Sequence, residues 1–328
     1  MHRPPMAPAL VLLLAALTPA AIAQSDPPET EQSDTERPQA ESAEQTPEEQ
    51  SPDSLSLSVY LEGVYNAHTD FDDDIGELKL TEYHAGINAI VRTENAGVFN
   101  IGFDAGLLDY DITPSATSVA GDAADIGQGF EDIHTLSLIA IYTDAINEST
   151  NWFAGAGVIS AGEKDADFDE TIDWLGTAGF SHKFSDKLQI GIGVLVKTRL
   201  DDDLLIVPIP QIRYDIDERW SISSERAGLK INYKASDALS YGVTGEYDTI
   251  SFRLDDSHAL APEAMATHRR IPIAAYAVYT PSPAIEIRGR IGTALGGELE
   301  ILDDDGDEIA SQDIDAAIFG SLTVSFRF

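Results

Sequence analysis

The 328-residue chain contains no cysteine, three methionines and few basic residues. The lack of cysteine excludes disulfides, cysteine-ligated zinc, iron–sulfur clusters, thiol nucleophiles and a lipid-modified cysteine anchor. The 20 lysines and arginines face 57 acidic residues, which gives a formal charge of −37. Binding to nucleic-acid phosphates needs a basic surface, so this charge argues against a nucleic-acid partner.

Long apolar runs and helical periodicity are also missing. No segment after the first 23 residues has the ~18 apolar residues of a transmembrane helix. No stretch keeps apolar residues at i, i+3, i+4 and i+7 for three turns. The absence of both patterns predicts a chain without substantial helices.

Residues 1–23 have the pattern of a secretory signal peptide. Arg3 precedes a short apolar run at 9–17, and small residues at Ala21 and Ala23 form a cleavage site. The alternative, a membrane anchor, would need a longer run to cross ~30 Å of hydrocarbon. We therefore expect export with cleavage after Ala23.

Residues 24–54 contain no aliphatic side chain larger than alanine, and Arg37 is their single basic group. Such a segment cannot bury enough apolar surface to offset chain entropy, so it is expected to be a disordered acidic linker. A docking segment for a cell-wall component is the alternative. The expected organisation is thus a signal peptide (1–23), a linker (24–54) and a β domain (55–328).

From residue 55 onward, apolar and polar residues alternate over long segments. The last strand carries one apolar face, made of Ala316, Ile318, Gly320, Leu322, Val324, Phe326 and Phe328. The ranges 55–67, 187–198 and 284–296 alternate in the same way. A period of two residues is typical of β-strands with two different faces.

Two architectures share this alternation: a secreted soluble β-sandwich and a membrane β-barrel. Strand length favours the barrel, since a tilted membrane strand needs ~9–11 residues and a globular strand averages ~5–6. Pairs of aromatic residues near one set of turns suggest an interfacial girdle. These pairs are Tyr142 and Trp152, Phe180 and Phe184, Tyr214 and Trp220, Tyr233 and Tyr241, and Tyr276 and Tyr279.

The connections alternate in length, which also favours the barrel. Tight turns are expected at 94–96, 185–187, 215–218, 236–238 and 281–283. Longer acidic connections are expected around 68–75, 111–130, 162–170, 255–268 and 302–314.

With these features the chain resembles bacterial outer-membrane β-barrel proteins. The resemblance rests on the signal peptide, the alternation over 55–328 and the carboxyl end, where Phe328 closes a run with Phe326, Val324 and Leu322. Such an end resembles the signal recognised by the outer-membrane assembly machinery, with Phe326 and Phe328 as its aromatic residues. The segments Val207–Pro210, Arg213–Tyr214 and Arg219–Ile222 are similar to those of an uncharacterised outer-membrane barrel family. The resemblance implies an all-β fold, location in the outer membrane of a Gram-negative-type cell, and contact with its lipid.

The expected fold is a transmembrane antiparallel up-and-down β-barrel of fourteen strands, with twelve as the alternative. Fourteen requires that 219–224 and 228–234 form two short strands, and without this split the count is thirteen. An even number returns both ends of the chain to the periplasmic side, as in bacterial single-chain barrels.

No motif indicates catalysis, and we expect neither enzyme activity nor a cofactor. The histidines lack the spacing of a zinc site, and there is no nucleophile elbow or phosphate loop. His84 lies near Glu82 and by parity faces the lumen, where it could pair with a carboxylate. A lumen-facing hydrolase stays as a third functional hypothesis.

Acidic runs at 70–74, 201–203 and 303–308 suggest weak binding of divalent cations such as calcium. Asp303, Asp305 and Asp307 alternate as in an EF-hand loop, although Gly306 is fourth instead of sixth. A solvated loop face, or the acidic surface of a salt-adapted organism, is the simpler interpretation.

Alternation predicts a charged lumen. The lumen-lining candidates are Glu62, Glu82, His84, Asp104, Arg213, Lys230, Glu246, Glu286, Arg288 and Arg290. If their charges pair across the lumen they close it, and if they segregate on opposite walls they create a transverse field for small solutes. We expect a passive pore for small polar or cationic solutes. The alternative is a non-conducting structural or surface-interaction barrel.

Overall fold

The computed structural model describes residues 55–72, 76–93, 97–114, 130, 132–200, 204–255, 264–303 and 306–328. The predicted signal peptide and linker lie outside these residues. The strands are β1 (Leu55–Asp70), β2 (Gly76–Arg92), β3 (Val98–Pro114), β4 (Ile133–Asn147), β5 (Thr150–Glu163), β6 (Ile172–Ser185), β7 (Leu188–Thr198), β8 (Leu204–Asp215), β9 (Trp220–Glu225), β10 (Gly228–Lys234), β11 (Leu239–Glu246), β12 (Asp248–Arg253), β13 (Met265–Ser282), β14 (Ile285–Leu302), β15 (Glu308–Ile314) and β16 (Ala317–Arg327). One short 3-10 turn, η3 (Phe168–Thr171), precedes β6. Over the described ranges, no helix is long and apolar enough to span a membrane.

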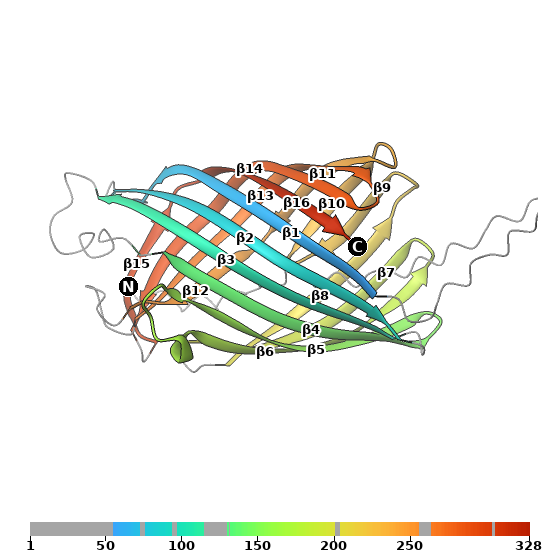
Figure 1. Ribbon diagram of the computed structural model, residues 1–328, viewed down its shortest axis with the longest axis horizontal. Coiled ribbons are helices and arrows are strands. Elements are labelled where there is room, and N and C mark those ends of the chain that lie inside the picture. Colours follow the sequence, from blue (N-terminus) through green and yellow to red (C-terminus); the bar gives the residue numbers. More distant parts are fainter. Residues whose placement is uncertain are drawn as a thin grey trace, which may run out of the picture.

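The strands form a closed antiparallel up-and-down barrel of fourteen strands (Figure 1). Strands β11 and β12 both pair with β13, and β15 and β16 both pair with β14, so each couple is one interrupted strand of the wall. Pairing of β1 with β16 closes the ring between the two chain ends. The predicted class and strand number are therefore confirmed, including the split of the 219–234 segment into β9 and β10.

One predicted connection is wrong. Residues 302–314 were expected to form a long acidic loop, but 308–314 are β15, which pairs with β14. Acidic residues at Glu308 and Asp313 mask the strand pattern there. Between β14 and β15 the Asp303 carboxylate accepts a hydrogen bond from the Asp307 backbone N–H at 2.8 Å.

In the part of the barrel nearer the tight turns, the outward face of the wall is apolar. Large side chains such as Leu61, Ile192, Ile291 and Leu322 are between 49% and 66% exposed on it. Rings at the tight-turn end pack together, with centroids 4.9 Å apart for Trp220 and Tyr233. Exposed apolar strands with aromatic ends are the surface that a barrel presents to lipid.

Tyr276 departs from the predicted girdle. It is only 5% exposed and donates a hydrogen bond to Asn232 Oδ1 at 2.7 Å. It lies at an even position of β13, and the exposed apolar residues Ile271, Ile273 and Tyr279 occupy odd positions. Tyr276 therefore faces the lumen, and Tyr279 alone of this pair faces outward.

The tight turn between β8 and β9 is organised by one carboxylate. Asp217 Oδ1 accepts hydrogen bonds from the backbone N–H groups of Trp220 and Arg219, each at 2.8 Å. These bonds favour the charged form and lower the pKa of the Asp217 carboxyl. The turn thus fixes the position of Trp220, the first residue of β9.

The face pattern inverts toward the other end of the barrel. On β2, Leu78 and Leu80 are buried inside, while Glu77 and Lys79 point outward. Outward charges here pair between strands, as in Lys79–Asp111 at 3.8 Å and Arg269–Glu298 at 3.0 Å. An apolar interior with a charged exterior is the pattern of a protein in water, so this end extends beyond the apolar belt.

Fifteen buried apolar side chains fill this extended end. We call this cluster the apolar seal; its members are Phe71, Leu78, Leu80, Leu108, Tyr110, Phe130, Ile133, Ala161, Phe252, Leu254, Ala264, Ala266, Leu299, Ile301 and Ile314. Its aromatic rings pack edge to face, with Phe130 and Phe252 at 5.2 Å. Strand β12 also contacts β5, through a parallel bridge between Arg253 and Gly162.

A second apolar cluster lies inside the wall of β4 to β8. We call it the inner apolar cluster; it comprises Ile139, Ile141, Phe153, Ile159, Leu175, Leu195, Leu205, Val207 and Ile209, with Ala227 packed against it.

Strand β8 has one incomplete edge. It pairs with β7 along its whole length, but with β9 only from Arg213 to Asp215, because the β9–β10 hairpin is short. The Ser224 hydroxyl takes over where the ladder stops: it accepts from Ile212 N at 3.0 Å and donates to Pro210 O at 3.4 Å.

Substitution Ser224→Ala should lower the free energy of unfolding by about 1 kcal/mol, since the Ile212 N–H loses its acceptor at the end of the ladder. Urea unfolding of the protein refolded in lipid vesicles would measure this, with Ser221→Ala on the same strand as control. Equal unfolding midpoints for the two variants would contradict this role of Ser224.

Candidate functional site: the polar lumen

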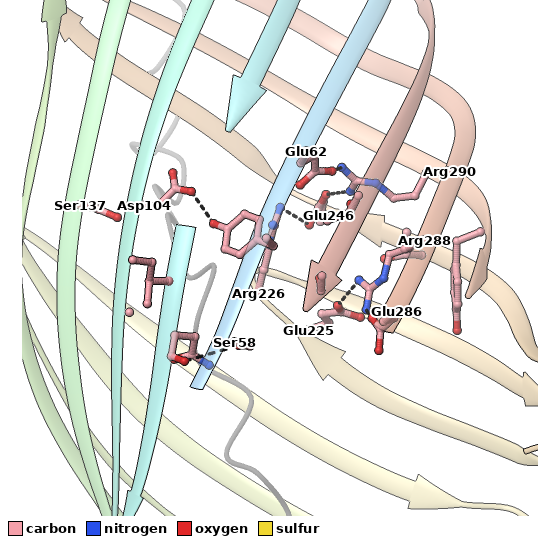
Figure 2. Close-up of a pocket in the computed structure, with 18 of the residues that line it drawn as sticks. Ser58, Glu62, Asp104, Ser137, Glu225, Arg226, Glu246, Glu286, Arg288 and Arg290 are labelled. Carbon is pink, nitrogen blue, oxygen red and sulfur yellow. Dashed lines mark hydrogen bonds and ion pairs between the residues drawn. The ribbon is translucent and has the colours of Figure 1, made fainter. Parts of the chain in front are cut away.

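Polar side chains line two cavities inside the half of the barrel that is nearer the tight turns. The larger cavity has a volume of about 300 Å³ and lies toward the tight turns, with Ser58, Thr323 and Ser325 at its wall (Figure 2). The smaller has about 90 Å³ and reaches from Glu62 to Arg270, below the apolar seal. Together they carry most of the charge inside the barrel.

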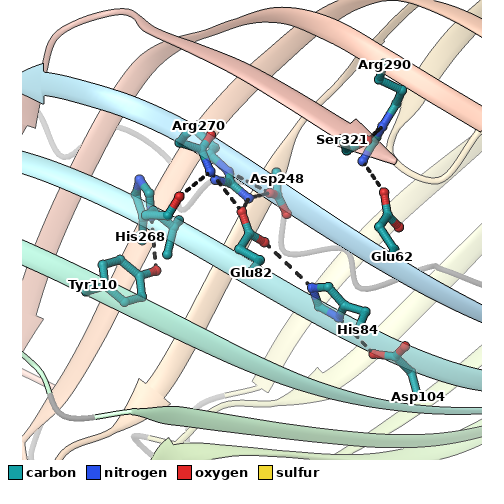
Figure 3. A network of polar contacts seen from close by, with 12 residues as sticks. Glu62, Glu82, His84, Asp104, Tyr110, Asp248, His268, Arg270, Arg290 and Ser321 are labelled. Carbon is teal, nitrogen blue, oxygen red and sulfur yellow. Dashed lines mark hydrogen bonds and ion pairs between the residues drawn. The ribbon is translucent and has the colours of Figure 1, made fainter. Parts of the chain in front are cut away.

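Next to the apolar seal, an ion pair crosses the lumen. Arg270 on β13 reaches Glu82 on β2 at 2.8 Å and Asp248 on β12 at 2.7 Å (Figure 3). Strands β13 and β2 are not neighbours, because β14, β16 and β1 lie between them. Asn66 adds a bond to Glu82 Oε1 at 3.2 Å, so the carboxylate is held from both sides.

His84 continues this network along β2. Its Nε2 lies 3.7 Å from Glu82 and its Nδ1 3.2 Å from Asp104. The Tyr60 hydroxyl donates to the same Asp104 carboxylate. These contacts hold the imidazole between two acceptors (Figure 3).

Arg290 binds two carboxylates in the middle of the lumen. Its guanidinium lies 2.8 Å from Glu62 and 3.2 Å from Glu246, and its Nε donates to Ser321 Oγ at 2.8 Å. The planar group of five N–H donors suits such multiple acceptors. Arg290 thus ties together β14, β16, β1 and β11.

A third group lies nearest the tight turns. Glu225 on β9 accepts from Lys230 at 2.9 Å and from Arg288 on β14 at 3.1 Å (Figure 2). Lys230 also lies 5.0 Å from the centre of the Tyr276 ring, a cation–π contact. Because β9 and β14 are separated by β10, β11 and β13, the Arg288–Glu225 pair spans the lumen.

Arg226 stands at the tip of the β9–β10 hairpin, inside the barrel. Its φ of 52° is in the left-handed region, which is costly for a residue with a side chain and is usually occupied by glycine in hairpin turns. The conformation places its guanidinium 3.7 Å from Glu246. The strained backbone at Arg226 therefore coincides with an ion pair inside the lumen.

The structure places nine of the ten lumen candidates on the two cavities. They are Glu62, Glu82, His84, Asp104, Lys230, Glu246, Glu286, Arg288 and Arg290. Arg213 is not among the lining residues; its side chain is 48% exposed and lies 3.5 Å from Asp215 near the turn. The charges are paired rather than segregated on opposite walls.

Sequence reasoning missed Arg270, Arg226 and Glu225 as lining residues. Parity could have found Arg270, since it shares its face with the inward Tyr276. Arg226 belongs to a turn, where alternation gives no direction, and its role follows from the hairpin ending inside the lumen.

The described ranges contain no group of three or more His, Cys, Asp or Glu side chains arranged to hold a metal ion. Much of the acidic runs proposed for divalent cations, including 73–74, 201–203 and 304–305, lies outside the described residues.

No family model matches the chain, and no curated protein matches it. Among solved structures, it is similar to an outer membrane channel from Pseudomonas putida F1, with 11% identity over 86% of this chain and 99% of the other, and a TM-score of 0.45. It is similar to the P. putida toluene transporter TodX, with 10% identity over 85% and 91% of the two chains and a TM-score of 0.41. It is also similar to P. putida OprB, with 10% identity over 84% and 94% and a TM-score of 0.34. At these identities and scores, none of the three indicates what this chain carries.

Substitution Arg290→Gln should lower the free energy of unfolding by roughly 1–3 kcal/mol, because Glu62 and Glu246 would lose their shared cationic partner. The matched control is Arg213→Gln, which breaks an exposed pair expected to contribute only ~0–1 kcal/mol. Urea unfolding of both variants in vesicles measures the difference. Indistinguishable midpoints would mean that water in the lumen replaces the lost contacts of Arg290.

Proposed function

We propose that this protein is an outer-membrane channel for small polar solutes, with a preference for cations, and that the structure is its closed state. The observation that carries the proposal is a polar cavity inside a closed barrel, ending at an apolar seal. A purely structural barrel has no need of a charged interior space of about 300 Å³.

The balance of charge supports a cation preference. The residues lining the two cavities include seven carboxylates: Glu62, Glu82, Asp104, Glu225, Glu246, Asp248 and Glu286. They also include five permanent cations: Arg226, Lys230, Arg270, Arg288 and Arg290. His84, which lies between Glu82 and Asp104, cancels one of the two excess negative charges when it is protonated. A net negative charge in a confined, poorly screened space raises the local concentration of cations.

The apolar seal supplies the closure. Water and ions leave a narrow apolar constriction, so such a segment stops conduction even without strong contacts. Opening would require the seal residues Phe252, Leu254 and Ala264 to move away from β2 and β3. Strand β12 pairs with β13 along its length but with β5 only through a single bridge, so its contact with the β5 side of the barrel is the one that opening would break.

Membrane location follows from the outward apolar belt and the aromatic rings at its end. We assign the tight-turn end, where both Leu55 and Phe328 lie, to the periplasm, in keeping with short periplasmic turns in barrels of this class. Export by residues 1–23 and assembly through Phe326 and Phe328 belong to the same proposal.

A non-conducting structural barrel is the second candidate. The specific observation in its favour is that the lumen charges are paired, with Arg270–Glu82 and Arg288–Glu225 bridging strands that are not neighbours. Paired charges of this kind hold the walls together and reduce the field available to a solute.

Planar-bilayer recording of the refolded protein without residues 1–23 distinguishes the two candidates. The wild-type protein should show rare, small, cation-selective steps. Phe252→Ala removes a fully buried ring of the seal and should raise the frequency of opening about tenfold or more, since a wetter constriction conducts.

Phe180→Ala, which removes a ring that is 54% exposed on the outward face, should leave the frequency unchanged. Heat-modifiable migration on gels confirms that each variant forms a barrel. If folded wild-type and Phe252→Ala proteins both never conduct, the structural candidate replaces the channel.

A further inference from the structure

The two lumen cavities meet at a shared set of side chains. Six residues line both cavities, and we call them the lumen neck: Tyr60, Glu62, Asp104, Arg226, Glu246 and Arg290. They come from β1, β3, β11, β14 and the tip of the β9–β10 hairpin (Figure 2). A solute that moves from one cavity to the other passes these side chains, so the neck is where the barrel can select it.

Arg226 brings unused hydrogen-bond donors to the neck. Its contact with Glu246 is 3.7 Å long, which is an ion pair beyond hydrogen-bonding distance. Within the part of the chain that the structure describes, its guanidinium donates no hydrogen bond, although the group carries five N–H donors. Arg290 in the same neck differs, because it donates to Glu62, Glu246 and Ser321.

The backbone of Arg226 has a conformation in which glycine is usual. Residues 226 and 227 form the two-residue turn between the paired Glu225 and Gly228, and a positive φ at the first turn position favours glycine. Among the described residues, Arg226 is the only non-glycine with a positive φ. Glycine would relieve the backbone but would take the guanidinium out of the neck. An outlier of this kind motivates a functional hypothesis for the side chain.

Two carboxylates of the neck each keep one unused oxygen. Arg290 donates to Oε1 of Glu62 at 2.8 Å and to Oε1 of Glu246 at 3.2 Å. The Oε2 atoms of these two residues accept no hydrogen bond from the described residues. Glu246 Oε2 is the atom that lies 3.7 Å from Arg226. Unused donors and an unused acceptor therefore lie next to each other.

The neck carries charges of both signs in near balance. Its carboxylates are Glu62, Asp104 and Glu246, and its cations are Arg226 and Arg290. His84, which contacts Asp104, brings the sum to zero when it is protonated. Neither a simple anion nor a simple cation is favoured by such a set, since each would leave one kind of unused group without a partner.

A small zwitterion satisfies both kinds of group at once. The carboxylate of an α-amino acid can accept from the Arg226 guanidinium, and its ammonium on the adjacent carbon can donate to the free oxygens of Glu246 and Glu62. The ion pairs of Arg290 stay intact, because these contacts use only donors and oxygens that Arg290 does not occupy.

The larger cavity limits the side chain of such a ligand. Its volume of about 300 Å³ is at the lower end of the ~300–1,000 Å³ typical of small-molecule sites. The wall that faces the ion pairs of β9 and β14 is small and uncharged there, with Ser58, Gly102 and Ser137 (Figure 2). Such a wall suits a small neutral side chain better than a charged one.

We propose that the lumen neck binds the zwitterionic form of small neutral α-amino acids, and that Arg226 selects them by their carboxylate. The inference rests on the proposed axial channel and narrows its class of small polar solutes to amino acids.

Calorimetric titration of the refolded protein without residues 1–23, in detergent micelles, tests the ligand class. L-alanine carries both charged groups, N-acetyl-L-alanine keeps only the carboxylate, and L-alanine methyl ester keeps only the ammonium. L-alanine should bind at least tenfold more tightly than either analogue, because only the zwitterion uses both Arg226 and the free carboxylate oxygens.

Two glutamine variants test the role of Arg226. Arg226→Gln should weaken the binding of L-alanine at least tenfold and should not weaken the binding of the methyl ester, which has no carboxylate for Arg226. Arg213→Gln is the matched control, since Arg213 does not line either cavity. If Arg226→Gln does not give a heat-modifiable barrel, Arg226→Gly removes the guanidinium with the residue that the turn favours.

Three results would each overturn the inference: no heat from L-alanine with the wild-type protein, equal affinities for L-alanine and its methyl ester, or unchanged L-alanine binding by the Arg226 variants. Binding is measured without conductance, so the two proposals can fail separately. Current in planar bilayers without alanine binding would remove the amino-acid site and leave the channel. Alanine binding by a barrel that never conducts would support the site and remove the channel.

Discussion

Satisfaction of backbone hydrogen bonds is the constraint on which the structure depends. Within hydrocarbon there is no water to bond an exposed N–H or C=O group, so a wall of strands has to close on itself. The pairing of β1 with β16 meets this demand between the chain ends. At β8 the short β9 ladder is extended by the Ser224 hydroxyl, which accepts from the Ile212 N–H and donates to the Pro210 carbonyl, while Pro208 and Pro210 have no N–H to satisfy.

The lumen obeys a second rule, that charges removed from bulk water are paired. Arg290, Arg270 and Glu225 each contact two partners of opposite sign, and their bridges connect strands that are far apart in the sequence. The network stabilises the shape of the barrel, because without these ion pairs the centre of the lumen would hold only water. It also leaves carboxylates in excess, which biases the same space toward cations.

The barrel changes environment along its axis. Near the tight turns, the apolar residues face outward and the charged residues face inward. At the opposite end, Leu78, Leu80 and Leu299 face inward into the seal, and Glu77, Glu298 and Glu300, which alternate with them, are not part of it. The end that holds the apolar seal therefore has the residue pattern of a water-soluble barrel, and the end with the tight turns has that of a membrane barrel. This arrangement explains why the polar cavity ends at an apolar cluster.

The sequence by itself predicted the class of fold and fourteen strands, with twelve as the alternative, and it indicated which residues could face the lumen. The period of two residues is a local property, and an even strand number follows from where the chain ends must lie. It also drew attention to Val207–Pro210, although without a structural reason for the prolines.

Only the tertiary structure decided which charges meet and what the alternation means at each height. Alternation separates two faces but does not say which one is inside, so Leu78 and Leu80 have the same pattern as lipid-facing residues. Arg226 and the short β9–β10 hairpin could not be placed from sequence, because a turn has no parity. The seal and the paired charges depend on register between strands distant in the chain, which no local pattern encodes.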